Sequence, residues 1–441
     1  MELKKYNNIL KINQIVHSVS ETHRFDKDKL IAINTSDVEN GMMNGGTLTP
    51  VEELKGQFKK TIMKGDILFS EIRPANRRFA KVTIEDCDNF VVSTKLMVLR
   101  KYNKDVDLEY FYYCLTNQHF LNILQRRAEN RIGSFPQITF DLLSEYAFPI
   151  PPISEQKRIS KVISTLDKKI AINRAINQNL EAMAKQLYHY WFVQFDFPNE
   201  EGKPYKSSGG EMVWNEKLKR DIPISWEIKL IDDVAEIYNG STPSTINELN
   251  YGGDIVWITP KDLSDQKQKF VYKGERNISQ VGYDSCSTHL LPSNTILMSS
   301  RAPIGLLAIA KTELCTNQGF KSFVPKSGNT AIYLYYYLQY HIRQIEQLGT
   351  GTTFKEVSRE DILKFPMLKP SDNVLNLWEE MVSALNDRQL EIQKENESLT
   401  KQRDELLPLL MNGQVSVNSD LAASLMLKIM VIHSNIATGH K

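Results

Sequence analysis

The feature that most constrains the fold of this 441-residue chain is a tandem repeat. Four short segments of the first half match four segments of the second half in the same order. The matches are INTSDV at 33–38 with ITPKDL at 258–263 (offset 225), ILFS at 67–70 with ILMS at 296–299 (offset 229), YFYYCL at 110–115 with YLYYYL at 333–338 (offset 223), and FPQI at 135–138 with FKEV at 354–357 (offset 219). Small loop insertions in a duplicated unit would make the offset between matching segments vary slightly, as it does here, whereas chance matches would not keep chain order. We therefore interpret the chain as one unit written twice.

A long helical pattern follows each repeat. Apolar residues recur at seven-residue spacing, which predicts a helix with a narrow coiled-coil seam. We expect the first helix at about residues 155–193 and the second at about 374–411, with Pro408 kinking the last turn. The expected seam, where the two helices would meet, consists of Ile159, Leu166, Leu180 and Leu187 in the first helix, and Leu385, Ile392, Leu399 and Leu406 in the second.

The two helical patterns carry opposite charge. Residues 155–195 contain seven Lys or Arg and three acidic residues. Residues 374–412 contain four Lys or Arg and eight acidic residues. The first helix is therefore positive and the second negative, which favours packing of one on the other. The alternative is that each seam is the core face of its own domain.

Length and pattern together predict the domain organisation. A chain of 441 residues is too long for one ordinary core and has room for two. Short apolar runs at 90–99 and 295–310 alternate with aromatic helical stretches, which is typical of small α+β domains. We expect two similar α+β domains in a tandem repeat, each followed by one of the two long helices. The expected boundaries are domain 1 at 1–152, the first helix at 153–195, a connector at 196–225, domain 2 at 226–370, the second helix at 371–413, and a tail at 414–441.

The sequence contains no recognisable catalytic constellation. It has no phosphate-binding G-x-x-x-x-G-K-[ST] loop and no G-x-G-x-x-G motif, and its eight histidines lack metalloprotease spacing. Glu227 and Lys229 resemble half of a nuclease motif, but the partner acidic residue is missing, so a strand is expected there. The sequence therefore predicts a non-catalytic chain without cofactor or metal.

The sequence shows no membrane-spanning segment and no cysteine pattern typical of a secreted protein. The longest apolar stretch, at 421–432, is too short to span a bilayer. The four cysteines are far apart and form no C-x-x-C pair, so neither a disulfide framework nor a zinc site is indicated. We expect a cytoplasmic protein.

A net charge of only +1 means that any binding of nucleic acid must use local patches. The densest basic cluster lies at 73–81, and the repeat aligns it with the loop at 299–305. The residues that we expect to contact DNA are Arg73, Asn76, Arg77, Arg78 and Lys81 in the first half, and Ser300, Arg301, Asn317, Gln318 and Lys321 in the second. Arg can pair with guanine, Asn with adenine, and the remaining cations with phosphate. The alternative is a pair of solvated polar turns. The tyrosine stretches, by contrast, are expected in the core.

The chain resembles the specificity subunits of Type I restriction-modification systems from residue 1 to about 415. The segments that carry the resemblance are PPISEQ at 151–156, YWFVQFDFP at 190–198 with GKPYKSSGGEMVW at 202–214, GSTPS at 240–244 with GGDIVWI at 252–258, and LLPLLMNG at 406–413. Three features depart from the family pattern: the second helix lacks a Pro-Pro opening, the first half lacks the GSTPS entry, and the tail after Val417 matches nothing.

The resemblance implies two similar α+β target-recognition domains separated by a pair of long antiparallel coiled-coil helices, in a pseudo-two-fold tandem repeat. Each domain would read half of a split double-stranded DNA site. It further implies that two methyltransferase subunits dock on the chain and that restriction subunits join through them. Those partners would use S-adenosylmethionine and ATP. The alternatives are a fused methyltransferase or nuclease with its own target domains, and a coiled-coil adaptor unrelated to DNA.

Overall fold

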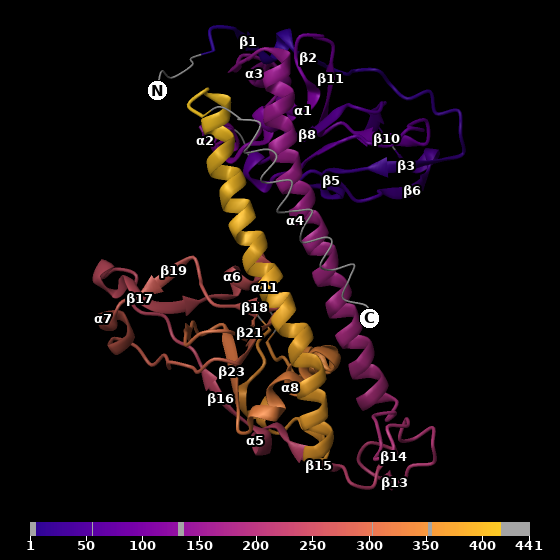
Figure 1. Cartoon of the computed structure of the whole chain (residues 1–441), viewed down its shortest axis with the longest axis vertical. Coiled ribbons are helices and arrows are strands. Elements are labelled where there is room, and N and C mark those ends of the chain that lie inside the picture. The colour runs from indigo at the N-terminus through magenta and orange to yellow at the C-terminus, as the bar shows by residue number, and fades with distance from the viewer. Residues whose placement is uncertain (1–5, 55, 131–135, 302, 352–354, 416–441) are drawn as a thin grey trace. The chain divides into compact units, whose positions relative to one another are not determined.

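The computed structural model describes residues 6–54, 56–130, 136–301, 303–351 and 355–415 (Figure 1). Almost all of the expected tail therefore lies outside the described residues, as do Phe135 and Phe354 of the last repeat match. The chain forms two compact units. Unit 1 takes the described residues of Met1–Arg174 and Glu395–Lys441, and unit 2 takes those of Ala175–Lys394. Each unit contains part of both long helices.

Unit 1 is an α+β domain built on two four-stranded sheets. The strands of the first sheet, in spatial order, are β2 (Val16–Ser18), β11 (Leu96–Lys101), β8 (Ile67–Ser70) and β9 (Phe79–Lys81), and those of the second are β6 (Thr47–Pro50), β3 (Lys29–Ile33), β10 (Phe90–Ser93) and β7 (Phe58–Lys60). Smaller pairs are β1 (Ile9–Lys11) with β12 (Ala147–Pro149), and β4 (Val38–Glu39) with β5 (Met42–Met43). The helices of the domain include α1 (Leu108–Thr116), α2 (Gln118–Glu129), α3 (Phe140–Ser144) and the 3-10 turn η4 (Pro74–Asn76).

Unit 2 repeats this plan. The main sheet consists of β16 (Ala235–Asn239), β23 (Phe320–Pro325), β20 (Ile296–Ser299), β21 (Leu307–Ala310) and β18 (Phe270–Val271), and a second sheet of β19 (Arg276–Ile278), β17 (Tyr251–Ile258) and β22 (Cys315–Thr316). Two-stranded pairs are β15 (Glu227–Leu230) with β24 (Pro366–Lys369), and β13 (Met212–Asn215) with β14 (Arg220–Pro223). The helices include α5 (Ile231–Val234), α6 (Pro260–Gln266), α7 (Gln280–Asp284), α8 (Ala331–Tyr340), α9 (Ile342–Gln347) and α10 (Arg359–Leu363). The hairpin β13–β14 lies within the stretch that we expected to be a connector.

Strand register confirms the predicted duplication. In unit 1 Ser70 pairs with Leu96, and in unit 2 Ser299 pairs with Phe320 at the same point of the same strand order. The one parallel contact of each second sheet is also shared, between β3 and β10 in unit 1 and between β17 and β22 in unit 2. The α+β fold class and the tandem repeat are therefore confirmed.

The two long helices occur where the heptad pattern predicted them. Helix α4 (Ile153–Tyr188) starts directly after Pro152 and passes into one turn of π-helix, η5 (His189–Val193). Helix α11 (Asp372–Met411) contains Pro408 inside its last turn. The helices are antiparallel within each unit, because contacts later along α4 meet residues earlier along α11. In unit 1 Asp167 pairs with Arg403 and Lys169 with Glu395, and in unit 2 Asn177 bonds Gln389 and Tyr188 packs against Trp378.

The core of each unit combines the aromatic helix of the domain with both long helices. In unit 1 Tyr110 and Phe111 of α1 share a cluster with Ile159 of α4 and Leu410 of α11. In unit 2 the tyrosines of α8 share a cluster with Tyr188 of α4 and Trp378 of α11. The expectation that the tyrosine stretches form core is confirmed. Within the described part of the chain, no helix combines the length and apolar character needed to cross a membrane.

The expected seam residues differ in burial. Ile159, Leu166 and Ile392 are buried, whereas Leu180, Leu187, Leu385, Leu399 and Leu406 are half-buried. Ile159 and Leu406 pack in the core of unit 1, and Leu187 and Leu385 pack against the core of unit 2. These four residues therefore pack in the cores of the two units, as the alternative interpretation expects, whereas their role in pairing the two helices stays a prediction.

Candidate nucleic-acid interface

The basic cluster of unit 1 lies on a strained loop between β8 and β9. Arg73 and Arg77 flank η4, and both have left-handed backbones, with φ of 46° and 54°. This conformation costs about 1–2 kcal/mol for a residue with a Cβ and tends to occur at functional sites. The loop is held by Arg73 N–H donating to the carbonyl of Pro136 at 3.0 Å, and by Ala75 N–H donating to Gln125 Oε1 at 3.1 Å. The loop is thus fixed in a conformation that its sequence does not favour.

Three of the predicted DNA contacts on this loop bind groups of their own domain. Arg77 donates from Nε to Asn40 Oδ1 at 2.7 Å and from Nη1 to Gln118 Oε1 at 2.5 Å. Burial lowers its pKa, and the nearby Arg403 lowers it further.

The neighbouring cations are engaged as well. Arg78 donates to the carbonyl of Ser36 at 3.1 Å and lies 3.8 Å from Glu39, while Lys81 forms an ion pair with Glu109. The side chains of Arg73 and Asn76 are exposed. The cluster therefore divides into exposed groups that can meet a ligand and half-buried groups that shape the loop.

The matching loop of unit 2 begins at the end of β20. Ser300 is buried and donates from its hydroxyl to the carbonyl of Gly319 at 3.3 Å, so it cannot face a ligand. Arg301 is half exposed and donates from Nε to Glu356 Oε2 at 3.0 Å. Lys321 is buried and donates to the other oxygen, Glu356 Oε1, at 3.2 Å. Burial alone would raise the pKa of Glu356, but the hydrogen bonds from Lys321 and Arg301 outweigh it and lower that pKa.

The remaining predicted contacts lie on the turn before β23. Asn317 is half-buried and accepts from Gly319 N–H at 2.9 Å. Gln318 is exposed and accepts from the hydroxyl of Thr242. Gly240 lies against this turn so closely that a Cβ there would sit 2.2 Å from the Asn317 carbonyl oxygen. The entry loop at 240–244 and the turn at 317–318 therefore pack as one surface.

Sequence reasoning missed the acceptors that hold these cations. Asn40, Gln118 and Glu109 each bind a cation of the unit 1 cluster, and Glu356 binds two in unit 2. A signal for Glu356 was present, because the repeat aligned it with Gln137.

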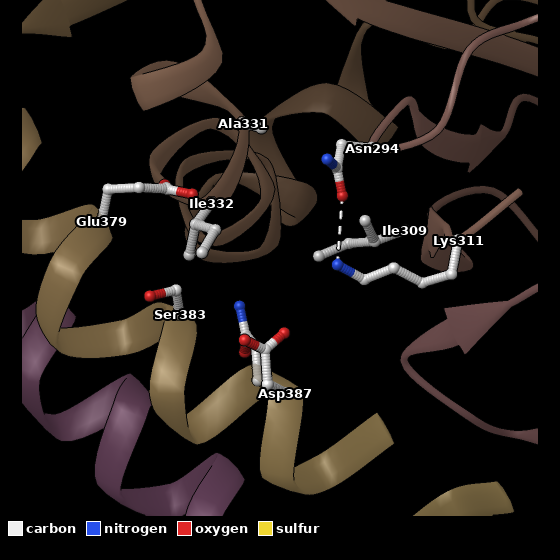
Figure 2. Close-up of a pocket in the computed structure, with 9 residues that line it drawn as sticks. Asn294, Ile309, Lys311, Ala331, Ile332, Glu379, Ser383 and Asp387 are labelled. Atoms are coloured by element: carbon white, nitrogen blue, oxygen red, sulfur yellow. Dashed lines mark hydrogen bonds between the residues drawn. The ribbon is translucent and has the colours of Figure 1, made fainter. Parts of the chain in front are cut away.

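Unit 2 also contains a cavity of about 180 Å³ beside α8 and α11 (Figure 2). Lys311 points across it and donates to Asn294 Oδ1 at 3.0 Å, while Glu379 and Asp387 face it from α11. Burial lowers the pKa of Lys311 and raises that of Glu379. The lining supplies charges but no nucleophile paired with a base. Across the described ranges, no three His, Cys, Asp or Glu side chains lie close enough together to hold a metal ion.

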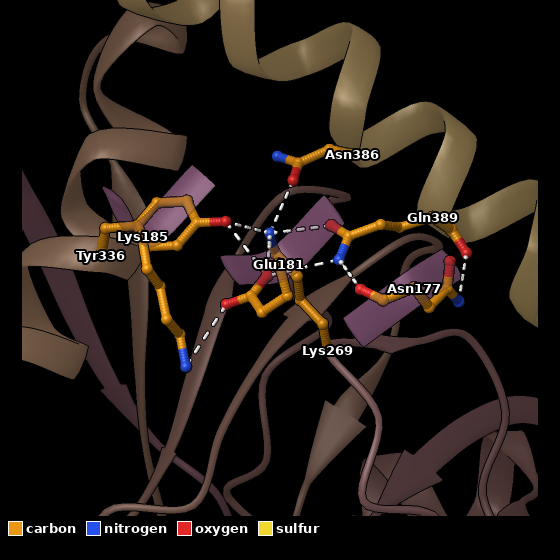
Figure 3. Close-up of polar contacts among 7 residues, drawn as sticks. All are labelled: Asn177, Glu181, Lys185, Lys269, Tyr336, Asn386 and Gln389. Atoms are coloured by element: carbon orange, nitrogen blue, oxygen red, sulfur yellow. Dashed lines mark hydrogen bonds and ion pairs between the residues drawn. The ribbon is translucent and has the colours of Figure 1, made fainter. Parts of the chain in front are cut away.

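A polar cluster of unit 2 joins its α+β domain to both long helices (Figure 3). Lys269 Nζ donates to Glu181 Oε2 of α4 at 3.0 Å, to Asn386 Oδ1 of α11 at 2.6 Å and to Gln389 Oε1 at 3.2 Å. The hydroxyl of Tyr336 lies 2.5 Å from the same nitrogen. Burial lowers the pKa of Lys269 to about 8, although Glu181 opposes the shift. We call these five residues the Lys269 cluster.

Comparison with known proteins gives a consistent picture. The model of the Type I restriction modification DNA specificity domain matches residues 7–182 and again 223–395. The specificity subunit of Type I restriction enzyme HindI from Haemophilus influenzae is 32% identical over 448 residues, covering 89% of this chain and 96% of that subunit. The MjaIX specificity subunit of Methanocaldococcus jannaschii is 39% identical over 182 residues, 41% of this chain and 42% of that subunit. The crystal structure of a Type I restriction-modification S subunit from M. genitalium superposes with a TM-score of 0.54 at 16% identity, covering 93% of this chain and 97% of that one. This last likeness concerns the fold alone.

Proposed function

Since the chain belongs to the Type I restriction-modification DNA specificity family, we propose that it is the specificity subunit of such a system and reads a bipartite site in double-stranded DNA. The observation that carries this proposal is the double match of one DNA specificity domain to both repeats. Two copies of one reading domain in a single chain give two reading surfaces, just as the two halves of a dimer meet two half-sites.

The reading surfaces that we propose are the loops that follow β8 and β20, in domains with proposed boundaries 1–152 and 226–370. Arg73 and Asn76 are exposed on the first loop, and Arg301 is half exposed on the second. An arginine fork fits guanine O6 and N7, and an asparagine amide fits adenine N6 and N7. The half-buried cations Arg77, Arg78 and Lys81 would then support the loop and add positive potential toward phosphate.

We further propose that the chain itself neither methylates nor cuts DNA, and that it directs methyltransferase subunits and, through them, restriction subunits. S-adenosylmethionine and ATP would belong to those partners. The described residues of this chain offer charged loops and helix surfaces but no reacting constellation. The DNA that such a subunit reads lies in the cytoplasm, where we place its action.

Two measurements on purified protein test this proposal. The chain would be prepared alone and together with methyltransferase subunits of its own system, then assayed for transfer of labelled methyl groups and for selection of duplexes from a random library. We expect no transfer by the chain alone, transfer by the complex, and a selected motif of two short parts separated by a fixed unread gap. Transfer by the isolated chain in independent preparations, or a continuous motif, would contradict the proposal.

A further inference from the structure

Glu356 holds two of the predicted reading cations of unit 2 at once. Each oxygen of its carboxylate accepts from a different side chain, Oε2 from Arg301 and Oε1 from Lys321. The three side chains differ in exposure, at 50% for Arg301, 36% for Glu356 and 7% for Lys321. The buried Lys321 therefore balances the charge of Glu356, and only Arg301 can extend toward a ligand.

The backbone around Glu356 is fixed on both sides. Thr350 N–H donates to the Glu356 carbonyl at 3.1 Å, and Glu356 N–H donates to the Thr350 carbonyl at 3.0 Å. On the other side, Arg301 and Glu356 form an antiparallel bridge, next to a bond from Val357 N–H to the carbonyl of Ser300 at 3.1 Å. Because both backbones are held, the Arg301–Glu356 contact has a defined geometry rather than that of two mobile surface chains.

This contact leaves donors available on Arg301. It uses the Nε–H group, while the two terminal amino groups of a guanidinium carry four further N–H donors. An arginine whose side chain is already ordered loses less entropy when it binds, and its planar fork matches guanine O6 and N7. A lysine or an untethered arginine would more simply neutralise phosphate.

The same position in unit 1 carries a different pair. Ile72 and Gln137 form the corresponding bridge, and Gln137 Nε2 donates to Glu71 Oε2 at 2.8 Å. The backbone bridge is thus retained in both domains, while the Arg301 position holds Ile72 in unit 1 and the Glu356 position holds Gln137, which bonds the carboxylate of the adjacent Glu71. Two domains of the same fold can read different half-sites if the backbone at such a position is the same and the side chains differ.

We propose that Glu356 is a positioning residue that orients Arg301 to read a guanine in the half-site of the second domain. This inference rests on the proposed function, since it assigns a base to a surface that we propose to bind DNA. It adds a specificity-determining residue that does not itself need to touch the base.

The test compares base preferences of complexes assembled with methyltransferase subunits, using a random duplex library. The variants are Arg301→Ala, Glu356→Gln, Glu356→Asp and the double variant Arg301→Ala with Glu356→Gln. The matched control is Glu391→Gln, which removes the carboxylate of an exposed Arg388–Glu391 pair on α11 with the same residue types and a distance of 2.9 Å. Thermal unfolding of each complex verifies assembly, and Glu356→Asp carries the test if the glutamine variant fails to assemble.

We expect Arg301→Ala to lose a guanine preference at one position by roughly tenfold, the size of one bidentate contact. Glu356→Gln should relax the same position, Glu356→Asp should retain part of the preference, and the double variant should equal Arg301→Ala because both act through one contact. The control should keep the wild-type motif.

Three results would overturn the inference. In the first, Glu356→Gln and Glu356→Asp keep the full guanine preference that Arg301→Ala loses, so the carboxylate does not position the arginine. In the second, Arg301→Ala weakens all sequences equally and flattens the salt dependence, which identifies a phosphate contact. In the third, the wild-type complex selects no split motif, which would contradict the proposed function itself and is recognisable before any variant is made.

Discussion

The two recognition domains are joined to the long helices in chemically different ways. In unit 1 Gln156 of α4 bonds the backbone of Asp105 and Asp107 in the domain, and the charged pair Asp167–Arg403 joins α4 to α11 at 2.9 Å, with side-chain exposures of 34% and 17%. In unit 2 the link is the Lys269 cluster, in which a nearly buried lysine of the domain reaches both helices. The apolar part of each junction is alike, because α1 and α8 pack on the helices in the same way.

Strand register explains part of this difference. Ala80 of unit 1 pairs with Leu68, and Ala308 of unit 2 pairs with Leu297 at the corresponding position. Ala80 also forms an isolated bridge with Gly41. Gly41 therefore stands at about the position of Lys269, where its φ is 89° and a Cβ would lie 2.7 Å from the hydroxyl oxygen of Tyr112. A lysine there would have a strained backbone and would meet the Tyr112 hydroxyl, and the charged pair of unit 1, Asp167–Arg403, instead lies between the two long helices. The duplicated frame thus keeps its shape while its polar contacts diverge.

The largest expected effect is that of Lys269→Met. It removes the donor that Glu181, Asn386 and Gln389 share, which should cost about 3–5 kcal/mol of unfolding free energy in urea. Adding Glu181→Leu should recover part of that loss, because one of the acceptors that lack a donor is then gone. Lys185→Met is the matched control, since Lys185 is 51% exposed and lies 3.7 Å from the same Glu181, and should cost less than about 1 kcal/mol. An equal loss for both lysines would show that burial of Lys269 has no special role.

The next effect is a pH dependence specific to unit 2. The pKa of Lys269 is lowered from 10.5 to about 8, so between these values the unfolded chain binds a proton that the folded chain does not. The free energy of unfolding therefore rises with pH between about 8 and 10.5, by up to about 3 kcal/mol. Below pH 8 Lys269 is charged in the folded chain, so the whole cost of burying that charge lowers the stability. The measurement is the stability of wild type minus that of Lys269→Met at pH 7.5, 8.5 and 9.5. A difference that stays constant or falls would contradict the assignment.

A smaller effect is expected for Asp167→Asn in unit 1. Arg403 keeps its contact with Asp404 at 2.7 Å, so the loss should be about 1–2 kcal/mol. Glu405→Gln, which removes an exposed partner of Lys401 at 3.9 Å, serves as a control with an expected change near zero. If Asp167→Asn destabilised the chain as much as Lys269→Met, the two junctions would be equivalent despite their different chemistry.

The sequence predicted what depends on local pattern. The repeat, the two heptad helices and the burial of the tyrosine stretches all follow from periodicity and order, and the structure has each of them. The polar clusters depend instead on partners far away in the chain. Lys269 follows the polar run SDQKQ at 264–268, which looks like a surface loop, and its partners Glu181 and Asn386 are 88 and 117 residues away.

The same limit applied to the candidate interface. Composition identified the basic cluster at 73–81. Only the tertiary structure shows that Arg77 and Lys81 bind their own domain, and that the side chain of Arg73 is exposed. The repeat aligned Gln137 with Glu356 in the sequence. Their partners, Glu71 for Gln137 and Arg301 for Glu356, could be identified only from the tertiary structure.

We propose that this chain selects a split DNA site for modification by its partners. The most direct measurement is a genome-wide map of modified bases in the host, by sequencing that detects them directly, with the gene for this chain deleted and then restored. We expect deletion to remove modification from one motif of two short parts with a fixed gap, and the restored gene to return it. A map that is unchanged by deletion, or a motif without a gap, would contradict the claim.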